Sequence, residues 1–246
     1  MKQYLPALGL LFAAPLAHAQ VRFSVGPQAG YTLATADYKY DYLYGNSYRT
    51  GYKSGFAAGI VAEAGVGHFA FQPAIQFAQK GFTLALTYPP SVNPSGMSAD
   101  VRYRLDYLTI PLSAVLTQKT DGQGARVFAG PYVGFLLGGR YTADVTYVSA
   151  GKPVQETQTG PIAVVADTYT SNVPTHDEIY ARRLDAGLQG GIGYRYQGLL
   201  LQASYSFGLR NVGASYANAS ANYANDPTYH NRVFQFSLAY LFGPES

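Results

Sequence analysis

The end of the chain alternates between large apolar side chains and small or polar ones. Over residues 232–242 one face would hold Phe234, Phe236, Leu238, Tyr240 and Phe242, and the other Gln235, Ser237 and Ala239. The two sets separate because successive side chains of an extended strand point to opposite sides. Such a strand suits a wall between lipid and a wet lumen, although a half-buried strand of a soluble sandwich alternates in the same way.

The same alternation recurs along the chain and predicts eight strands. They span residues 21–33, 55–66, 69–80, 101–116, 125–141, 180–196, 199–210 and 232–242. The connections after the first, third, fifth and seventh strands are long, and those after the second, fourth and sixth are short. This sorting is typical of outer-membrane barrels. The pattern therefore predicts an all-β fold: an eight-stranded antiparallel up-and-down transmembrane β-barrel with short periplasmic turns and long extracellular loops.

Two local features of this barrel are also predicted. The longest break between strands, residues 142–179, carries turn-forming residues and indicates a surface loop. Pro73, Pro111 and Pro131 fall inside predicted strands. Because a closed barrel has no edge, each proline removes a ladder hydrogen bond. We expect bulges or local irregularities at these prolines.

The first 19 residues have the features of a secretory signal peptide. Lys2 supplies a positive start, an apolar stretch runs from Leu5 to Ala17, and small residues form a cleavage site before Gln20. The apolar stretch is shorter than the roughly 20 residues that a membrane helix needs. We expect residues 1–19 to be removed and residues 20–246 to form one barrel domain in the cell outer membrane.

Composition narrows the classes of function. Cysteine is absent, so disulfides do not hold this exported fold together. With 17 basic and 14 acidic residues, the chain lacks the charge excess of a protein that binds nucleic acid. Aromatic residues make up 15% of the chain, yet no long apolar block follows the signal peptide. Strand alternation in a membrane barrel produces this combination.

Several short elements resemble a known family. They are Gln79-Lys80-Gly81, residues 107–112, residues 130–134, Asp185-Ala186-Gly187-Leu188 with residues 190–193, and the aromatic last strand. In this order and spacing the chain is similar to the PorT-like outer-membrane β-barrel family of Bacteroidetes-type bacteria. The resemblance spans nearly the whole mature chain. It implies an outer-membrane barrel but little about chemistry, and the founding member's link to protein secretion and gliding does not transfer.

Charged and polar side chains gather on the predicted lumen face. An eight-stranded barrel is only wide enough for side chains to fill, and charges taken out of water need partners. We expect a structural ion-pair plug, a gate on a narrow path for small solutes, or charges that simply reach bulk water at the rims. Arg195 or Arg210 is the expected partner of Glu63. The expected lumen cluster is Glu63, Lys80, Arg183, Asp185, Gln189, Arg195, Gln202 and Arg210.

Two other candidate functions are ligand contact through the loops and catalysis by a histidine. The tyrosine-rich stretch of residues 36–54 suits contact with an extracellular ligand or other envelope proteins, or an aromatic girdle against outer-membrane lipid. An outer-membrane lipid hydrolase would need a nucleophile, a base and an orienting group. His68, His176 and His230 lie in turns and loops without such a setting, although Asp177 adjoins His176. No ligand spacing predicts a metal, and no cofactor is expected.

A soluble binder shaped like a lipocalin would have an apolar lumen. Here the charged residues share the smaller, glycine-rich face of the strands, so the apolar side chains point outward to lipid. The pattern therefore favours membrane insertion. It indicates a structural or interaction role without enzyme activity.

Overall fold

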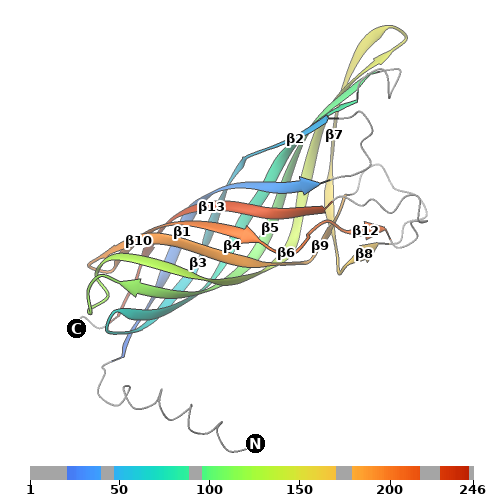
Figure 1. Cartoon of the computed structure of the whole chain (residues 1–246). Coiled ribbons are helices and arrows are strands. Elements are labelled where there is room, and N and C mark those ends of the chain that lie inside the picture. Colours follow the sequence, from blue (N-terminus) through green and yellow to red (C-terminus); the bar gives the residue numbers. More distant parts are fainter. Residues whose placement is uncertain (1–20, 40–46, 89–95, 170–178, 217–227, 244–246) are drawn as a thin grey trace, which may run out of the picture.

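Eight antiparallel strands form a closed ring in the computed structural model (Figure 1). The structure describes residues 21–39, 47–88, 96–169, 179–216 and 228–243, so the predicted signal peptide lies outside the described residues. In ring order the strands are β1 (Arg22–Lys39), β3 (Lys53–Val66), β4 (Phe69–Tyr88), β5 (Met97–Thr117), β6 (Gly124–Ser149), β10 (Leu184–Tyr196), β11 (Leu199–Gly208) and β13 (Thr228–Tyr240). The predicted eight-stranded barrel is confirmed.

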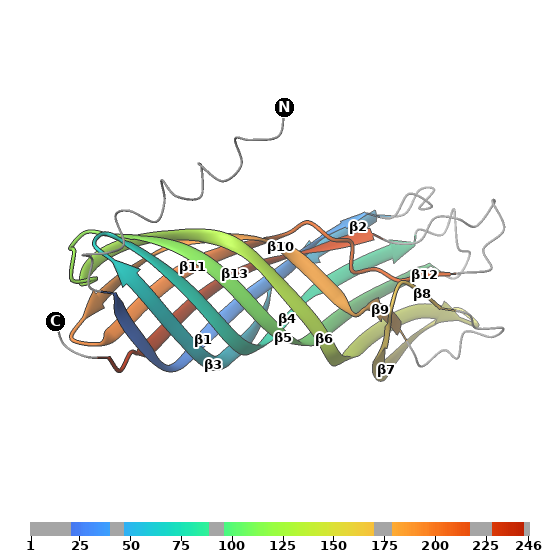
Figure 2. The same cartoon turned by 90° about the horizontal axis from the view of Figure 1, so that it is seen from below.

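The first and last strands close the ring. β1 pairs with β13 in an antiparallel ladder that runs from Gln28 opposite Ala239 to Lys39 opposite Thr228. The three short turns, residues 67–68, 118–123 and 197–198, lie at the same end of the barrel as the C-terminus (Figure 2). Short turns face the periplasm in outer-membrane barrels. We therefore name this end periplasmic and the opposite end extracellular.

Side chains alternate between the outer surface and the lumen as predicted. On β13, Phe236 is 56% exposed on the outside, whereas Ala239 is 3% exposed on the inside. On β10, Ile192 is 64% exposed on the outside and Asp185 is fully buried. Repeated around the ring, this pattern produces an apolar outer band. Such a continuous apolar surface is the one that a membrane barrel presents to lipid.

The extracellular end carries strands where the sequence predicts a loop. β6 continues to Ser149 and turns back at Ala150 and Gly151 into β7 (Lys152–Val165), so the prediction of a surface loop over residues 142–179 is wrong. Both turn residues have positive φ, 49° and 73°, which suits a two-residue hairpin turn. The hairpin forms because strand-favouring residues such as Val145 and Tyr147 continue beyond the level of the membrane.

Shorter strands complete this extracellular end. β2 (Ser47–Gly51) pairs with β4, and β9 (Ile179–Arg182) runs parallel to the end of β7. β8 (Thr168–Tyr169) and β12 (Ser215–Tyr216) form a small parallel pair. Together with the outer parts of β4, β5 and β6, these elements extend the protein beyond the ring (Figure 1).

The strand prolines interrupt pairing without shifting the register. The ladder skips the position opposite Pro73 between β3 and β4, opposite Pro111 between β4 and β5, and opposite Pro131 between β5 and β6. The predicted irregularities are confirmed as these local gaps. A bulge lies elsewhere, at Asp106 and Tyr107 of β5, where β6 contributes one extra residue.

Glycines on the lumen face of β10 make room for aromatic rings of β6. A Cβ at Gly187 would lie 2.8 Å from Tyr132 Cε1, and a Cβ at Gly191 would lie 2.5 Å from Phe128 Cζ. Each would also approach a backbone oxygen of β11, at 2.2 and 2.3 Å. Only glycine fits such close approaches. The small face of β10 therefore allows large β6 side chains to occupy the lumen.

Candidate functional site

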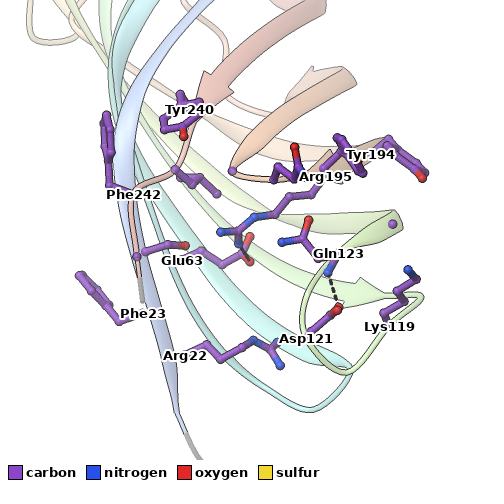
Figure 3. A pocket seen from close by; sticks show the side chains of 17 residues that line it. Arg22, Phe23, Glu63, Lys119, Asp121, Gln123, Tyr194, Arg195, Tyr240 and Phe242 are labelled. Carbon is purple, nitrogen blue, oxygen red and sulfur yellow. Dashed lines mark hydrogen bonds and ion pairs between the residues drawn. The ribbon is translucent and has the colours of Figure 1, made fainter. Parts of the chain in front are cut away.

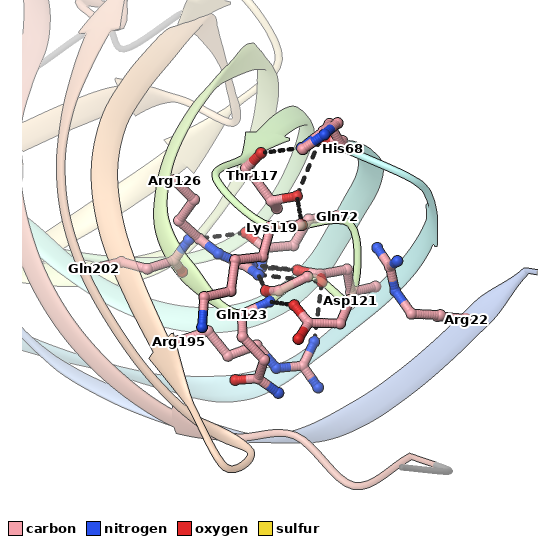
Figure 4. A network of polar contacts seen from close by, with 12 residues as sticks. Arg22, His68, Gln72, Thr117, Lys119, Asp121, Gln123, Arg126, Arg195 and Gln202 are labelled. Atoms are coloured by element: carbon pink, nitrogen blue, oxygen red, sulfur yellow. Dashed lines mark hydrogen bonds and ion pairs between the residues drawn. The ribbon is translucent and has the colours of Figure 1, made fainter. Parts of the chain in front are cut away.

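Near the periplasmic end, one carboxylate holds two guanidinium groups inside the lumen. Glu63 of β3 accepts hydrogen bonds from Arg126 Nη1 of β6 and, at 3.0 Å, from Arg195 Nη1 of β10. Figure 3 shows the side chain of Arg195 reaching toward Glu63. Gln72 of β4 donates to Glu63 at 3.2 Å, and Arg126 donates to the Gly122 carbonyl at 2.7 Å (Figure 4). Glu63 and Arg126 are only 3% and 2% exposed. Removing one partner of such a pair leaves a buried charge uncompensated. Because its members lie on β3, β4, β6 and β10, the cluster links four strands.

A belt of amide side chains fills the middle of the lumen. Side-chain hydrogen bonds of 2.9–3.3 Å link residues from β1, β4, β5, β10, β11 and β13. The linked pairs are Gln28–Gln76, Gln76–Gln235, Gln72–Gln202 and Gln189–Ser113. The belt carries no charge and encloses a cavity of about 30 Å³, which holds no more than a few water molecules.

Beyond the belt, a lysine and an aspartate form a second buried ion pair. Lys80 Nζ of β4 lies 2.8 Å from Asp185 Oδ2 of β10, with side chains 4% and 0% exposed. Asn231 Nδ2 donates to the same oxygen at 2.9 Å, and the Tyr132 hydroxyl lies 3.3 Å from both carboxylate oxygens. The rings of Tyr107 and Tyr132 lie 4.7 and 4.6 Å from Lys80 Nζ. Both ions therefore have several partners, as charges removed from water require.

Elements that carry the family resemblance meet in this second cluster. Gln79-Lys80-Gly81 supplies the ammonium group, and Asp185-Ala186-Gly187 supplies the carboxylate from 105 residues further along the chain. The elements that contain Tyr107 and Tyr132 supply the two rings. Four of the quoted motifs thus contribute to one contact network that the barrel assembles from β4, β5, β6 and β10.

An apolar cluster closes the extracellular end of the lumen. The ring of Phe82 lies 5.4 Å from that of Tyr229 and 4.6 Å from that of Tyr103, measured between centroids. The buried side chains of this cluster form a layer between the Lys80–Asp185 pair and the extracellular end. This layer, the apolar cap, is formed by buried side chains that include Phe82, Leu84, Leu105, Leu136, Ala181, Val212 and Tyr229.

Six of the expected lumen residues lie in these layers. Arg195 pairs with Glu63, and it is one of the two partners that the sequence predicts for this carboxylate. Glu63 and Lys80 do not contact each other but belong to separate clusters on either side of the amide belt. The six residues are Glu63, Lys80, Asp185, Gln189, Arg195 and Gln202.

Arg183 and Arg210 do not lie in the lumen cluster, contrary to the prediction. Arg183 is exposed at the break between β9 and β10, where its backbone N–H bonds to the Val165 carbonyl at 2.7 Å. Arg210 follows the end of β11 and pairs with Asp167 at 2.9 Å near the extracellular end. Neither residue follows the alternation of the lumen face, because Arg183 lies between β9 and β10 and Arg210 lies beyond the end of β11.

Arg126, Tyr132 and Asn231 are lumen residues that the sequence reasoning missed. Arg126 and Tyr132 do carry a signal, since they alternate with outward-facing residues such as Val127 along β6. Asn231 immediately precedes the predicted last strand, whereas β13 begins at Thr228.

Among the described residues, no group of three or more His, Cys, Asp or Glu side chains could hold a metal ion. His68 Nδ1 lies 2.9 Å from the Thr117 carbonyl in the turn region, and His176 and Asp177 fall outside the described residues. Within the part of the chain that the structure describes, no helix is long and apolar enough to cross a membrane.

The closed ring, the apolar outer band and the filled polar lumen define an integral outer-membrane β-barrel protein. The chain belongs to the family described as outer membrane protein beta-barrel domain, which residues 16–213 match. The matched segment includes seven of the ring strands and ends before β13. Membership of this family places the protein in the outer membrane.

Two solved barrel structures align with most of the chain at low sequence identity. Neisserial surface protein A is 15% identical, and the alignment covers 89% of this chain and 97% of that protein with a TM-score of 0.35. OprG of Pseudomonas aeruginosa is 11% identical, with coverage of 92% and 98% and a TM-score of 0.37. Neither alignment carries an argument about function. No curated protein sequence matches the chain.

Proposed function

We propose that the protein is a closed outer-membrane barrel that acts through its extracellular surface and not as a passage through the membrane. The observation that carries this proposal is the filled lumen: two buried ion-pair clusters and an amide belt lie beneath an apolar cap. The lumen residues then form a structural plug. Outer-membrane lipid surrounds the apolar band, and an extracellular ligand or another envelope protein contacts the outer end.

The shape of the outer end supports an interaction role. The β6–β7 hairpin projects beyond the ring (Figure 1), and Tyr48 on β2 and Tyr52 directly after β2 are exposed. The rings of Tyr38 and Tyr48 meet edge to face with centroids 5.4 Å apart. Rigid tyrosines with polar tips provide contact area at low entropic cost. Tyr40, Tyr42 and Tyr44 lie outside the described residues.

Recordings in planar lipid bilayers test the closed-barrel proposal. The purified protein, inserted in parallel with a large general porin, should show no large steady conductance, because the lumen of an eight-stranded ring is filled by side chains. A stable conductance comparable to that of the porin would contradict the proposal.

A narrow gated path for small solutes is the second candidate. The observation in its favour is that polar side chains line the interior from the periplasmic end as far as Lys80 and Asp185, so a solute would have to pass the amide belt and the apolar cap. Liposome-swelling assays distinguish the two functions. A gate predicts that wild type passes a small sugar and that Asp185→Asn changes the rate, whereas a plug predicts no passage by wild type.

We also propose that the chain belongs to the PorT-like subgroup and has no enzyme activity. The subgroup assignment is supported by the meeting of its motif residues around Lys80 and Asp185. This assignment predicts that, among sequences of the subgroup, the residues at positions 80 and 185 vary together. An alignment in which these two positions vary independently would count against the assignment. Hydrolysis of outer-membrane phospholipid by the purified barrel would contradict the second proposal.

A further inference from the structure

We propose that the periplasmic mouth of the barrel binds a small oxyanion, namely a carboxylate or phosphate group supplied from the periplasm. A cavity of about 580 Å³ opens there between the turns, the start of β1 and residues 240–243 (Figure 3). Its charged lining residues are Arg22, Glu63, Lys119, Asp121 and Arg195. The site lies on the opposite side of the plug from the extracellular surface, so it does not depend on the proposed function.

Among the described residues, the charges around this mouth do not cancel. Three cationic side chains line the cavity, and Arg126, which pairs with Glu63, adds a fourth cation next to it. Glu63 and Asp121 are the carboxylates among the lining residues. By contrast, the Lys80–Asp185 cluster at the other end of the lumen has one charge of each sign. An excess of positive charge in a confined, partly dry space favours the entry of an anion.

The guanidinium groups at the mouth still have hydrogen-bonding capacity. The side chain of Arg195 lines the cavity and is 12% exposed, and its Nε has no partner among the described residues. Arg22 donates to the Gly67 carbonyl at 3.0 Å. Within the described part of the chain, no ion pair joins Arg22 or Lys119 to a carboxylate. Unpaired guanidinium donors match the planar geometry of carboxylate and phosphate oxygens.

Two features limit the ligand that the mouth accepts. Asp121 accepts a hydrogen bond from the Gln123 backbone N–H at 2.8 Å, and its negative charge faces the same cavity. A ligand with more negative charge than a single phosphate group would exceed the positive excess of the mouth and be repelled by Asp121 and Glu63. The amide belt blocks deeper entry because its cavity is only about 30 Å³. The mouth therefore suits one small oxyanion group, free or at the end of a larger periplasmic molecule.

Isothermal titration calorimetry on the purified full barrel in a non-ionic detergent measures anion binding at this site. Inorganic phosphate and acetate are the two probes, each titrated at constant ionic strength set with sodium chloride. We expect saturable binding of at least one probe, and the stronger probe identifies the chemical group. Arg22→Gln and Arg195→Gln should each weaken binding roughly tenfold, because hydrogen bonds between charged groups are the stronger kind. Asp121→Asn should increase the affinity for the probe.

The matched control is Arg140→Gln, which removes an exposed arginine near the extracellular end. Its affinity for the probe should equal that of wild type. Heat-modifiable gel mobility verifies that each variant is folded, and Arg22→Gln is expected to fold because Arg22 takes no part in the buried pairs. The proposal is overturned if wild type binds neither probe saturably, or if Arg22→Gln and Arg195→Gln bind as tightly as Arg140→Gln.

Discussion

Glu63 and Asp185 are the residues on which the two lumen clusters depend. Glu63 is shared by two guanidinium groups, whereas Asp185 faces one ammonium group and the neutral donors Asn231 and Tyr132. In both clusters the carboxylate touches side chains from several strands. The loss of either carboxylate therefore leaves cations without a counter-charge inside the barrel.

Replacing either carboxylate should lower barrel stability strongly. Glu63→Ala and Asp185→Ala are each expected to reduce the free energy of unfolding by about 3–5 kcal/mol, the usual consequence of breaking a buried pair. Asp100→Ala is the control, because Asp100 is exposed at the outer end. Urea unfolding followed by circular dichroism measures all three. If both lumen variants unfold like wild type, the lumen charges are solvated and the plug hypothesis is wrong.

The Lys80–Asp185 pair should show strong energetic coupling. Lys80→Met and Asp185→Asn each leave the other charge alone, whereas the double variant leaves no net buried charge. The double variant should therefore be more stable than the sum of the single changes predicts, by about 1–3 kcal/mol. The same urea titrations provide the double-mutant cycle, and additive effects would show that the two groups act independently.

Alternation along single strands was enough to predict that Glu63, Lys80, Asp185 and Arg195 face inward. It could not predict which of them touch. Contacts across a lumen depend on the stagger of the whole ring, which no single strand encodes. Glu63 and Arg126, for example, lie on β3 and β6, which are not neighbours in the sheet.

At the scale of elements, the membrane-spanning strands follow from the sequence and the extracellular ones do not. The repeated lipid-facing positions mark each ring strand. That signal disappears above the membrane, where β7 exposes Lys152, Glu156 and Gln158 among other polar residues. β7 forms because it can pair with the continuation of β6, a contact that composition alone does not reveal.

Neighbouring glycines on β10 should respond differently to the same substitution. Gly191→Ala places a Cβ 2.5 Å from Phe128 Cζ and 2.3 Å from the Ala203 carbonyl oxygen, so it should destabilise the barrel by about 1–3 kcal/mol through overpacking. At Gly190 the nearest atom is 3.5 Å away, and Gly190→Ala should be close to neutral. Comparable urea midpoints for the two variants would show that β6 and β10 can separate at little cost.

The whole molecule is closed at one end and open at the other. The apolar cap and the extracellular strands cover the outer end, whereas a cavity of about 580 Å³ opens at the periplasmic end. A symmetric pore would show comparable openings on both sides. The asymmetry is consistent with a protein that presents a surface to the outside and keeps only the mouth below the amide belt open to the periplasm.

Export should produce a mature chain that begins at Gln20. Sequencing the N-terminus of protein recovered from the outer-membrane fraction measures the cleavage position. The unboiled protein should migrate differently from the boiled protein on a denaturing gel, because a closed barrel resists detergent until it is heated. Recovery of a soluble periplasmic product, or an intact N-terminus, would contradict this expectation.

The pairing of β1 with β13 also determines the order of assembly. This contact joins residues 28 and 239, nearly the full length of the mature chain apart, so its loop-closure entropy is large and it forms late. Until Thr228–Tyr240 docks, β1 and β11 each present an unpaired edge on which another chain could grow a sheet. A transcript truncated before β13 would therefore encode an aggregation-prone chain, and holdase chaperones must shield the intact one until its last strand arrives.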